Sequence, residues 1–154
     1  MTIRAATNED ITNMIELGHK VYVESRFSHL GYDIDKIKHG LEAFILLHAN
    51  GSHLALLAEN ADGRIIGGFL GAIEEYFFTT DKSANSILIW VDPDYRGSST
   101  AIKLIDIFKQ WAVKKGAKEI NILVSSGVKI GSTDRFFRRL GFVQSGGNYS
   151  MTLG

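Results

Sequence analysis

Hydrophobic and polar positions follow two periods along the chain, and these periods divide it into expected helices and strands. Apolar side chains recur at helical spacing in residues 11–22, 37–45, 101–112 and, more weakly, 133–140. Apolar runs typical of strands fill residues 2–5, 53–59, 64–73, 87–91, 119–124, 142–144 and 149–153. This order, β-α-α-β-β-β-α-β-α-β-β, predicts a mixed α/β fold with about seven strands and four helices.

Turn residues stand where these elements end. Thr7 to Asp10 offer a helix cap, and Asn50-Gly51 a helix stop. The turn Ala61-Asp62-Gly63 predicts one hairpin, and Gly146-Gly147 a second hairpin that closes the chain. With no repeat or linker, we expect a single domain over residues 1–154.

The segment Ile87 to Gly116 carries the strongest functional signal. Its apolar strand ends at Pro93, which cannot donate to a sheet, and small residues lead from there into a helix. The first N–H groups of such a helix are unpaired and suit a phosphate group. Gly97 permits close backbone approach and Arg96 adds a positive charge. An ordinary strand–turn–helix corner explains the pattern equally well.

Composition removes several function classes. The chain has 17 basic and 17 acidic residues, so it lacks the basic excess expected of a protein that binds nucleic acid or an anionic membrane. It has no cysteine, which excludes a thiol nucleophile, a disulfide framework and cysteine-ligated zinc. The five histidines show no metal-binding spacing, so we expect no metal. With no long apolar segment and no signal peptide, we expect a cytoplasmic location.

The element order, with VDPDYRGSSTA in the middle and RFFRRLGF near the end, resembles the GNAT superfamily of acetyl-CoA-dependent N-acetyltransferases over essentially the whole chain. In the family's pyrophosphate loop, Arg96 would be the leading residue and Ala101 the trailing small one. Ser99 stands where the family usually has a glycine. The resemblance implies a twisted, mostly antiparallel sheet and direct transfer of an acetyl group to an amine.

The resemblance also implies where acetyl-CoA would bind. The loop N–H groups would hold the pyrophosphate, and the preceding strand the pantetheine arm, with an N–H near Val91 at the oxyanion. The residues concerned are Ile89, Trp90, Val91, Arg96, Gly97, Ser98, Ser99, Thr100 and Ala101. The helix that contains Arg135, Phe136 and Arg139 would contact coenzyme A phosphates, although a solvated basic helix face accounts for these residues equally well.

Acid–base residues are harder to assign. The family's glutamate base is matched by Glu74 or Glu75, of which at most one can face a cleft because strand neighbours point to opposite sides. The tyrosine that protonates the thiolate in many relatives is replaced by Phe137, which has no proton to give. Ser132, Tyr149, Tyr95 or water would have to substitute.

The expected acceptor is a primary amine of a small molecule or a protein, which the sequence does not identify further. Its pocket would be lined by Phe27, His29, Tyr32 and Tyr76, unless these aromatic residues only seal the core. The resemblance leaves open a homodimer. Two alternatives also stay open: an acyl-CoA-binding module with little or no catalysis, and an interaction domain that has lost the cofactor.

Overall fold

The computed structural model describes all residues, 1–154, and contains one five-stranded sheet in the order β1-β2-β3-β4-β5. The strands are β1 (Thr2–Ala5), β2 (His53–Glu59), β3 (Ile65–Glu75), β4 (Lys82–Val91) and β5 (Glu119–Asn121). The helices are α1 (Ile11–Glu24), α2 (Ile34–Ala49), α3 (Thr100–Lys114) and α4 (Ile130–Arg139), with short 3-10 turns η1 (Asn8–Asp10) and η2 (Pro93–Tyr95). None of these helices is both long and apolar enough to cross a membrane.

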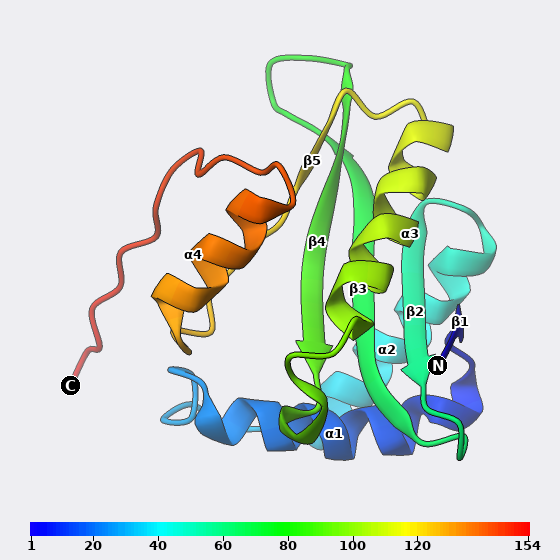
Figure 1. The fold of residues 1–154 in the computed structure, drawn as a ribbon, viewed down its shortest axis with the longest axis vertical. Helices are drawn as coiled ribbons and strands as arrows, with labels where there is room; N and C mark the ends of the chain where they lie inside the picture. The colour runs from blue at the N-terminus through cyan, green and yellow to red at the C-terminus, as the bar shows by residue number, and fades with distance from the viewer.

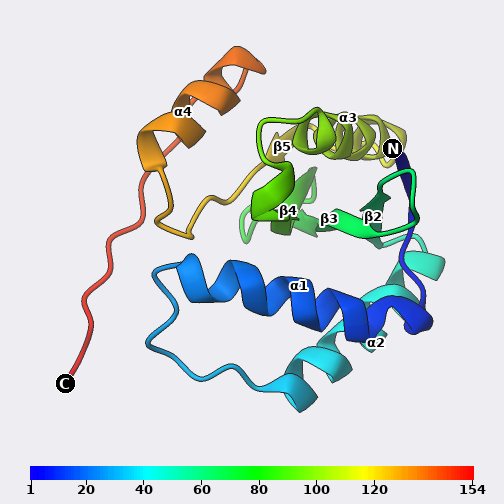
Figure 2. The same ribbon diagram turned by 60° about the horizontal axis from the view of Figure 1, so that its bottom comes forward.

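The sheet is sandwiched between helices, with α1 and α2 on one face and α3 on the other (Figures 1 and 2). The sequence of strand β2 is almost continuously apolar because the strand is covered on both faces. Ala55 and Leu57 pack in the cluster that includes α1, whereas Leu54, Leu56 and Ala58 pack in the cluster that includes α3. Because successive side chains point to opposite faces, a strand covered on both sides needs apolar residues throughout.

Turn chemistry sets both ends of α2, and its end at Ala49 confirms the stop predicted at Asn50-Gly51. Asp33 caps α2, where its carboxylate accepts a hydrogen bond of 3.0 Å from the Lys36 N–H. Past the end of α2, Gly51 adopts a left-handed conformation with φ of 84°. The predicted strand pair around residues 61–63 is also confirmed, since β2 and β3 are antiparallel neighbours.

The parallel pair of β4 and β5 positions the candidate site. The two strands pair only from Ser83 to Asn85 on β4, opposite Glu119 to Asn121 on β5. The pairing of β4 with β3 then shifts by one residue, so that Ile87 has no partner in the register. Such a bulge bends a strand and increases its twist. Beyond a last hydrogen bond of 2.8 Å from the Leu123 N–H to the Ser86 hydroxyl, the chain that follows β5 leads away from β4 to α4 (Figure 1).

The C-terminal hairpin predicted from residues 142–144 and 149–153 is wrong, and so is the count of about seven strands. Neither segment is a strand in the structure, and the chain after α4 runs away from the sheet (Figures 1 and 2). The predicted strand 119–124 is also shorter, ending at Asn121. A strand forms only where a partner satisfies its backbone groups, and these segments have none beside them.

Candidate cofactor-binding site

Asp92 fixes the start of the loop between β4 and α3. Its N–H donates to the Ile66 carbonyl at 2.8 Å, and its side chain is 1% exposed. The carboxylate accepts hydrogen bonds from Lys20 Nζ at 2.7 Å and Arg64 Nη2 at 2.8 Å, and from the Asp94 N–H at 3.0 Å. Burial alone would raise the pKa of Asp92, but the Lys20 hydrogen bond, the Asp94 N–H and the Arg64 charge lower it. The loop therefore begins from a buried, fully paired anion.

The loop presents free backbone donors. The N–H groups of Gly97, Ser99, Ala101 and Ile102 have no hydrogen-bond acceptor within the chain. Gly97 has a left-handed φ of 83°, and Ser99 an ordinary φ of −76°. A side chain at Gly97 would meet open space, so this backbone is accessible from outside. Together with the positive end of the α3 dipole, unpaired donors of this kind are the groups that an anion would need.

The other two hydroxyl residues of the loop are used within the chain. The Ser98 and Thr100 hydroxyls are 2.8 Å apart, and Thr100 is buried, with its hydroxyl directed to the Met1 sulfur at 3.2 Å. These contacts stabilise the first turn of α3, with Thr100 buried and Ser98 at the surface. Of the loop residues predicted to bind a cofactor, these two contribute the shape of the loop.

The Arg96 guanidinium forms a two-pronged ion pair with the carboxylate of Glu24 at the end of α1, one hydrogen bond of which is 3.0 Å long. Both side chains are about one-third exposed. The predicted cationic residue of the loop is thus present at its expected place, but it already has an anionic partner from another element.

The end of β4 offers backbone groups beside the loop. Because Asp92 donates to Ile66 of β3, the alternation of an antiparallel pair directs the N–H and C=O groups of Ile89 and Val91 away from β3. They face the side from which β5 has diverged. The backbone of Trp90 faces β3 instead, and its side chain is buried in the cluster with α1. Ile89 and Val91, not Trp90, therefore present free polar groups along this edge.

Gly68 makes the position of Trp90 possible. A Cβ atom at Gly68 would lie 2.2 Å from the Trp90 ring, a distance that real atoms never reach. The indole Nε1 is buried and has no hydrogen-bond partner in the structure. Packing on the glycine therefore holds the ring where it seals the core beneath the loop.

The predicted base residues lie at the opposite end of β3 and β4. Glu74 pairs in register with Ser83, eight residues before Val91, which corresponds to roughly 26 Å along a strand. The Glu74 carboxylate accepts a hydrogen bond of 2.5 Å from the Asn85 amide, whereas Glu75 is exposed and has no hydrogen-bond partner. The two carboxylates thus differ, since only Glu74 is fixed in orientation.

Tyr76 belongs to the same polar cluster. Its hydroxyl donates to Glu119 at 2.6 Å and accepts from the Asn121 amide at 3.0 Å. Asn121 also donates to Asn85 at 2.9 Å, which links Tyr76 to the residue that holds Glu74. The hydrogen bond to Glu119 raises the pKa of Tyr76. This network joins the ends of β3, β4 and β5.

The aromatic residues predicted for an acceptor pocket have mixed roles. Tyr32 packs against His19 and Tyr22, its hydroxyl donates to the Ile15 carbonyl at 2.7 Å, and burial raises its pKa. It therefore seals the core between α1 and α2. Phe27 and His29 lie in the connection from α1 to α2, where both contact Arg26.

The residues predicted on the last helix and beyond do not reach the loop. Ser132 accepts a hydrogen bond from Arg135 at 3.2 Å, and the Phe136 ring lies against the Phe137 ring. Tyr149 is 99% exposed. Figure 2 shows α4 set apart from the layers of the sheet, and no residue of α4 is buried. Ser132, Arg135, Phe136, Arg139 and Tyr149 are therefore not brought to Gly97 by their own chain.

Several residues that shape the site were not predicted. Asp92, Lys20 and Arg64 hold the loop start, Glu24 holds Arg96, and Asn85 holds Glu74. The sequence has one usable signal, an aspartate placed directly between an apolar strand and a proline. Their partners lie 11 to 72 residues away, beyond the range of local patterns.

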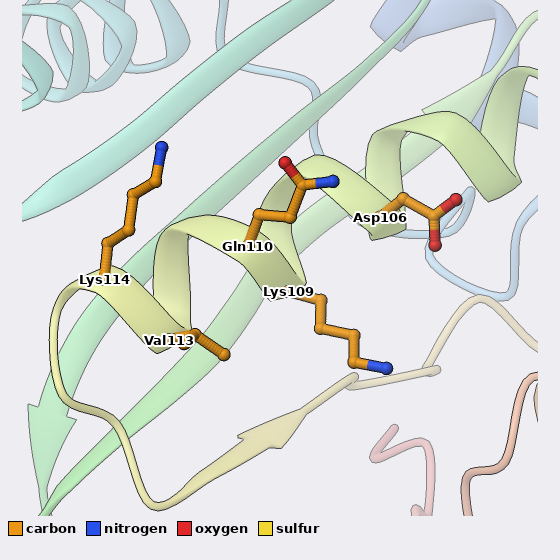
Figure 3. Close-up of a pocket in the computed structure, with 5 residues that line it drawn as sticks. All are labelled: Asp106, Lys109, Gln110, Val113 and Lys114. Atoms are coloured by element: carbon orange, nitrogen blue, oxygen red, sulfur yellow. The ribbon is translucent and has the colours of Figure 1, made fainter.

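A surface hollow elsewhere carries no site. It is lined by Asp106, Lys109, Gln110, Val113 and Lys114, all of them from the outer face of α3 (Figure 3). Their side chains spread apart over one exposed helix, and no second element closes the hollow. A second hollow, between α1 and the start of β3, contains Lys20, Arg64 and Asp92 and so lies beneath the loop.

Comparison with known proteins agrees with this geometry. A family model described as an acetyltransferase (GNAT) domain matches residues 50–144, which include β2 to α4 and the whole loop. The fold and this match define an acetyltransferase-type protein. The chain belongs to the GNAT acetyltransferase family. No curated protein matches the chain as a sequence.

Solved structures of the same fold span the whole chain. Glucosamine-6-phosphate N-acetyltransferase from Arabidopsis thaliana has a TM-score of 0.75 at 17% identity, covering 99% of this chain and 98% of that one. The aminoglycoside antibiotic 6'-N-acetyltransferase AAC(6')-IG from Acinetobacter haemolyticus has a TM-score of 0.69 at 24% identity, and the match covers 100% of this chain and 99% of that one. AAC(6')-Iy, in complex with a CoA-containing bisubstrate analog, has a TM-score of 0.75 at 19% identity, and the match covers 99% of this chain and 97% of that one. At these identities the likeness shows the fold alone.

Proposed function

We propose that this protein is an N-acetyltransferase that transfers the acetyl group of acetyl-CoA directly to a primary amine of a small molecule or protein. One observation carries the proposal: the free N–H groups of Gly97, Ser99, Ala101 and Ile102 open beside the edge where β5 leaves β4. A diphosphate needs such donors, and an extended amide-containing arm needs a free strand edge.

The residues of the chain fit coenzyme A in the following way. The loop N–H groups and Arg96 would hold the pyrophosphate, and the outward backbone groups of Ile89 and Val91 would bond the pantetheine amides. Bound acetyl-CoA supplies an activated acyl group. The protein's own contribution is then mainly to place the two substrates, since a well-oriented pair reacts without an acyl-enzyme.

Proton transfer is the less defined part of the proposal. Glu74 has the better-fixed carboxylate, but it lies roughly 26 Å along the strand from Val91, beyond the reach of a base that acts through one water, so neither Glu74 nor Glu75 serves as the base at the proposed site. For the leaving thiolate, Phe137 offers no proton, and Ser132 and Tyr149 lie on the detached C-terminal part of the chain. A thiol pKa of about 8.5 makes the thiolate a tolerable leaving group without an acid.

Thermal shift with coenzyme A and acetyl-CoA tests the proposed binding. Ligand at a hundredfold its Kd adds about 2.7 kcal/mol, or roughly 5–10 °C for a chain of this size. Gly97→Glu should abolish the shift, because it places a carboxylate among the anion donors. Gly116→Glu is the matched control: Gly116 has a φ of 77°, close to that of Gly97, equal open space, and lies beyond the far end of α3. Equal thermal shifts for the Gly97→Glu and Gly116→Glu variants would refute the assignment of the loop as the pyrophosphate-binding site.

A second candidate function is an acyl-CoA-binding module with little or no catalysis. Phe137 and Ser99 favour it, because both depart from the pattern of the catalytic family. Thiol release from acetyl-CoA in the presence of a panel of amines, with the acetylated product identified by mass spectrometry, separates the two. Binding without amine-dependent thiol release would support the module.

A further inference from the structure

The end of α1 joins the two chain segments that lead away from the paired part of β4 and β5. On the β4 side, Lys20 of α1 donates a hydrogen bond of 2.7 Å to Asp92, the residue directly after β4. On the β5 side, Arg26, two residues after α1, bonds the carbonyls of Ser125 and Ser126. We call the contacts of Arg26 with Ser125 and Ser126 the Arg26 clamp. The end of α1 therefore bridges the two segments (Figures 1 and 2).

The Arg26 clamp uses both the backbone and the side chain of Arg26. Its N–H donates to the Ser126 carbonyl at 2.8 Å, and its Nε donates to the Ser125 carbonyl at 2.7 Å. A Cβ atom at Gly127 would lie 3.2 Å from the Arg26 Cβ and 3.5 Å from its Cδ, so the aliphatic stem lies against the backbone there. The guanidinium covers the Phe27 ring, 4.2 Å from the ring centroid. The side chain is therefore fixed in direction, although it is exposed.

Ser25 couples the clamp rigidly to α1. It is 7% exposed, and its N–H donates to the Tyr22 carbonyl at 3.0 Å. Its hydroxyl donates to the same carbonyl at 2.8 Å and accepts from the Phe27 N–H at 3.2 Å. Because the residue between the helix and Arg26 is fixed in this way, the position of α1 determines the position of the clamp.

The edge of β4 is open between two fixed points. One is the hydrogen bond of 2.8 Å from the Leu123 N–H to the Ser86 hydroxyl, and the other is the Arg26 clamp. The β4 residues between them, 87–91, span roughly 16 Å of strand. Apolar side chains that are between 42% and 59% exposed flank this opening on both chain segments: Ile87, Leu88, Leu123 and Val124. The opening thus has apolar walls on both segments and a fixed point at each end.

We propose that Arg26 is a positioning residue for the pantetheine arm of coenzyme A, because it holds the chain after β5 at a fixed separation from the end of β4. The inference rests on the proposed function, which places the arm along this edge. Arg26 acts through the backbone of Ser125 and Ser126 and not by contact with the arm. The start of the loop is held separately, through the contacts of Asp92. Arg26 should therefore matter only for ligands that carry the arm.

Two ligands separate an effect on the arm from an effect on the loop. Coenzyme A carries the arm, whereas adenosine 3′-phosphate 5′-diphosphate keeps the nucleotide and the diphosphate without it. Arg26→Met keeps an unbranched stem and removes the donor to the Ser125 carbonyl. We expect the Kd of coenzyme A, measured by calorimetry, to rise about tenfold, as for the loss of one hydrogen bond. The Kd of the shorter ligand should not change.

Arg26→Gln separates the hydrogen bond from the charge. The glutamine amide nitrogen stands at the same point along the side chain as the arginine Nε, so it can donate to the Ser125 carbonyl but carries no charge. This variant should recover most of the affinity for coenzyme A that Arg26→Met loses. In the matched control, Lys114→Met removes an exposed cation from the outer face of α3 and should change neither Kd (Figure 3).

Amide hydrogen exchange tests the clamp without any ligand. Arg26→Met should speed the exchange of the Leu123 amide, because the chain after β5 would be free to move away from Ser86. Exchange of the buried Leu104 and Phe108 amides of α3 should not change. Faster exchange at all three amides would indicate a loss of global stability and would overturn the inference.

The binding experiments have three further outcomes that would overturn the inference. Equal losses of affinity for both ligands in Arg26→Met would place the effect on the loop or on the fold. An unchanged Kd of coenzyme A would remove the role of Arg26. Equal losses in Arg26→Gln and Arg26→Met would assign the effect to the charge. If the unaltered protein binds neither ligand, the proposed function fails instead, and unchanged exchange of the Leu123 amide in Arg26→Met would then overturn the clamp separately.

Discussion

The substitution Asp92→Asn should destabilise the protein and loosen the loop between β4 and α3. Asparagine has the same shape as aspartate, so it keeps an oxygen that can accept from the Asp94 N–H. It removes the charge that Lys20 and Arg64 share. The change therefore isolates the electrostatic part of the contact from its packing.

The expected loss of stability depends on how exposed Lys20 and Arg64, the partners of Asp92, are. Hydrogen bonds to charged groups contribute about 1.5–3 kcal/mol, and breaking a fully buried ion pair costs about 3–5 kcal/mol. Here only Asp92 is buried, whereas the Lys20 and Arg64 side chains are 41% and 54% exposed and can return to water. We therefore expect a loss of about 2 kcal/mol at pH 7, which corresponds to roughly 4–8 °C in Tm.

Denaturant unfolding as a function of pH provides the assay. The folded-state pKa of Asp92 is depressed, so its charge stabilises the fold above the unfolded pKa of about 3.9 and ceases to do so as pH falls through the folded pKa. The difference between wild type and Asp92→Asn should accordingly shrink below about pH 4. Asp94→Asn is the control, because Asp94 is 69% exposed and its ion pair should contribute at most about 1 kcal/mol. Equal effects of the two substitutions, or a difference independent of pH, would refute this reasoning.

Three further outcomes are expected. Gly68→Ala should lower the unfolding free energy by at least about 1–3 kcal/mol in denaturant titrations, because its Cβ would overlap the Trp90 ring. In the control, Gly40→Ala on the exposed side of α2 should raise the unfolding free energy by about 0.5–1 kcal/mol. The Arg4 hydrogen bond lowers the pKa of Asp10 to about 2, so Asp10→Asn should cost about 2 kcal/mol at neutral pH and progressively less as the pH falls from 4 toward 2, measured in the same titration. Phe137→Tyr should raise turnover in the thiol-release assay if proton supply to the thiolate limits the rate, and unchanged turnover would mean that another donor operates.

Much of the fold follows from local chemistry and could be predicted. Asp33 and Gly51 bound α2 because one caps a helix start and the other permits a left-handed end. The loop after β4 could be located because Pro93 ends the strand and Gly97 allows the turn. These features depend on residues within a few positions of each other.

The errors concern partners that are distant in sequence. Apolar and polar residues alternate over residues 149–153 as they do in a strand. The pattern does not identify a neighbouring strand, and these residues form no strand in the structure. The same limit applies to Arg96, whose sequence context indicates a free cation. Its partner Glu24 lies 72 positions earlier and becomes its neighbour only through the fold.

The contact between Glu24 and Arg96 has a consequence for how the loop would recruit its ligand. Glu24 acts as an internal competitor, since its carboxylate occupies the guanidinium that an incoming diphosphate would use. Glu24 also holds the Arg96 side chain in place. Binding of a diphosphate to Arg96 would therefore exchange one anion for another and would not have to order a free side chain. Loss of the competitor in Glu24→Gln should therefore tighten coenzyme A binding while making it more sensitive to salt.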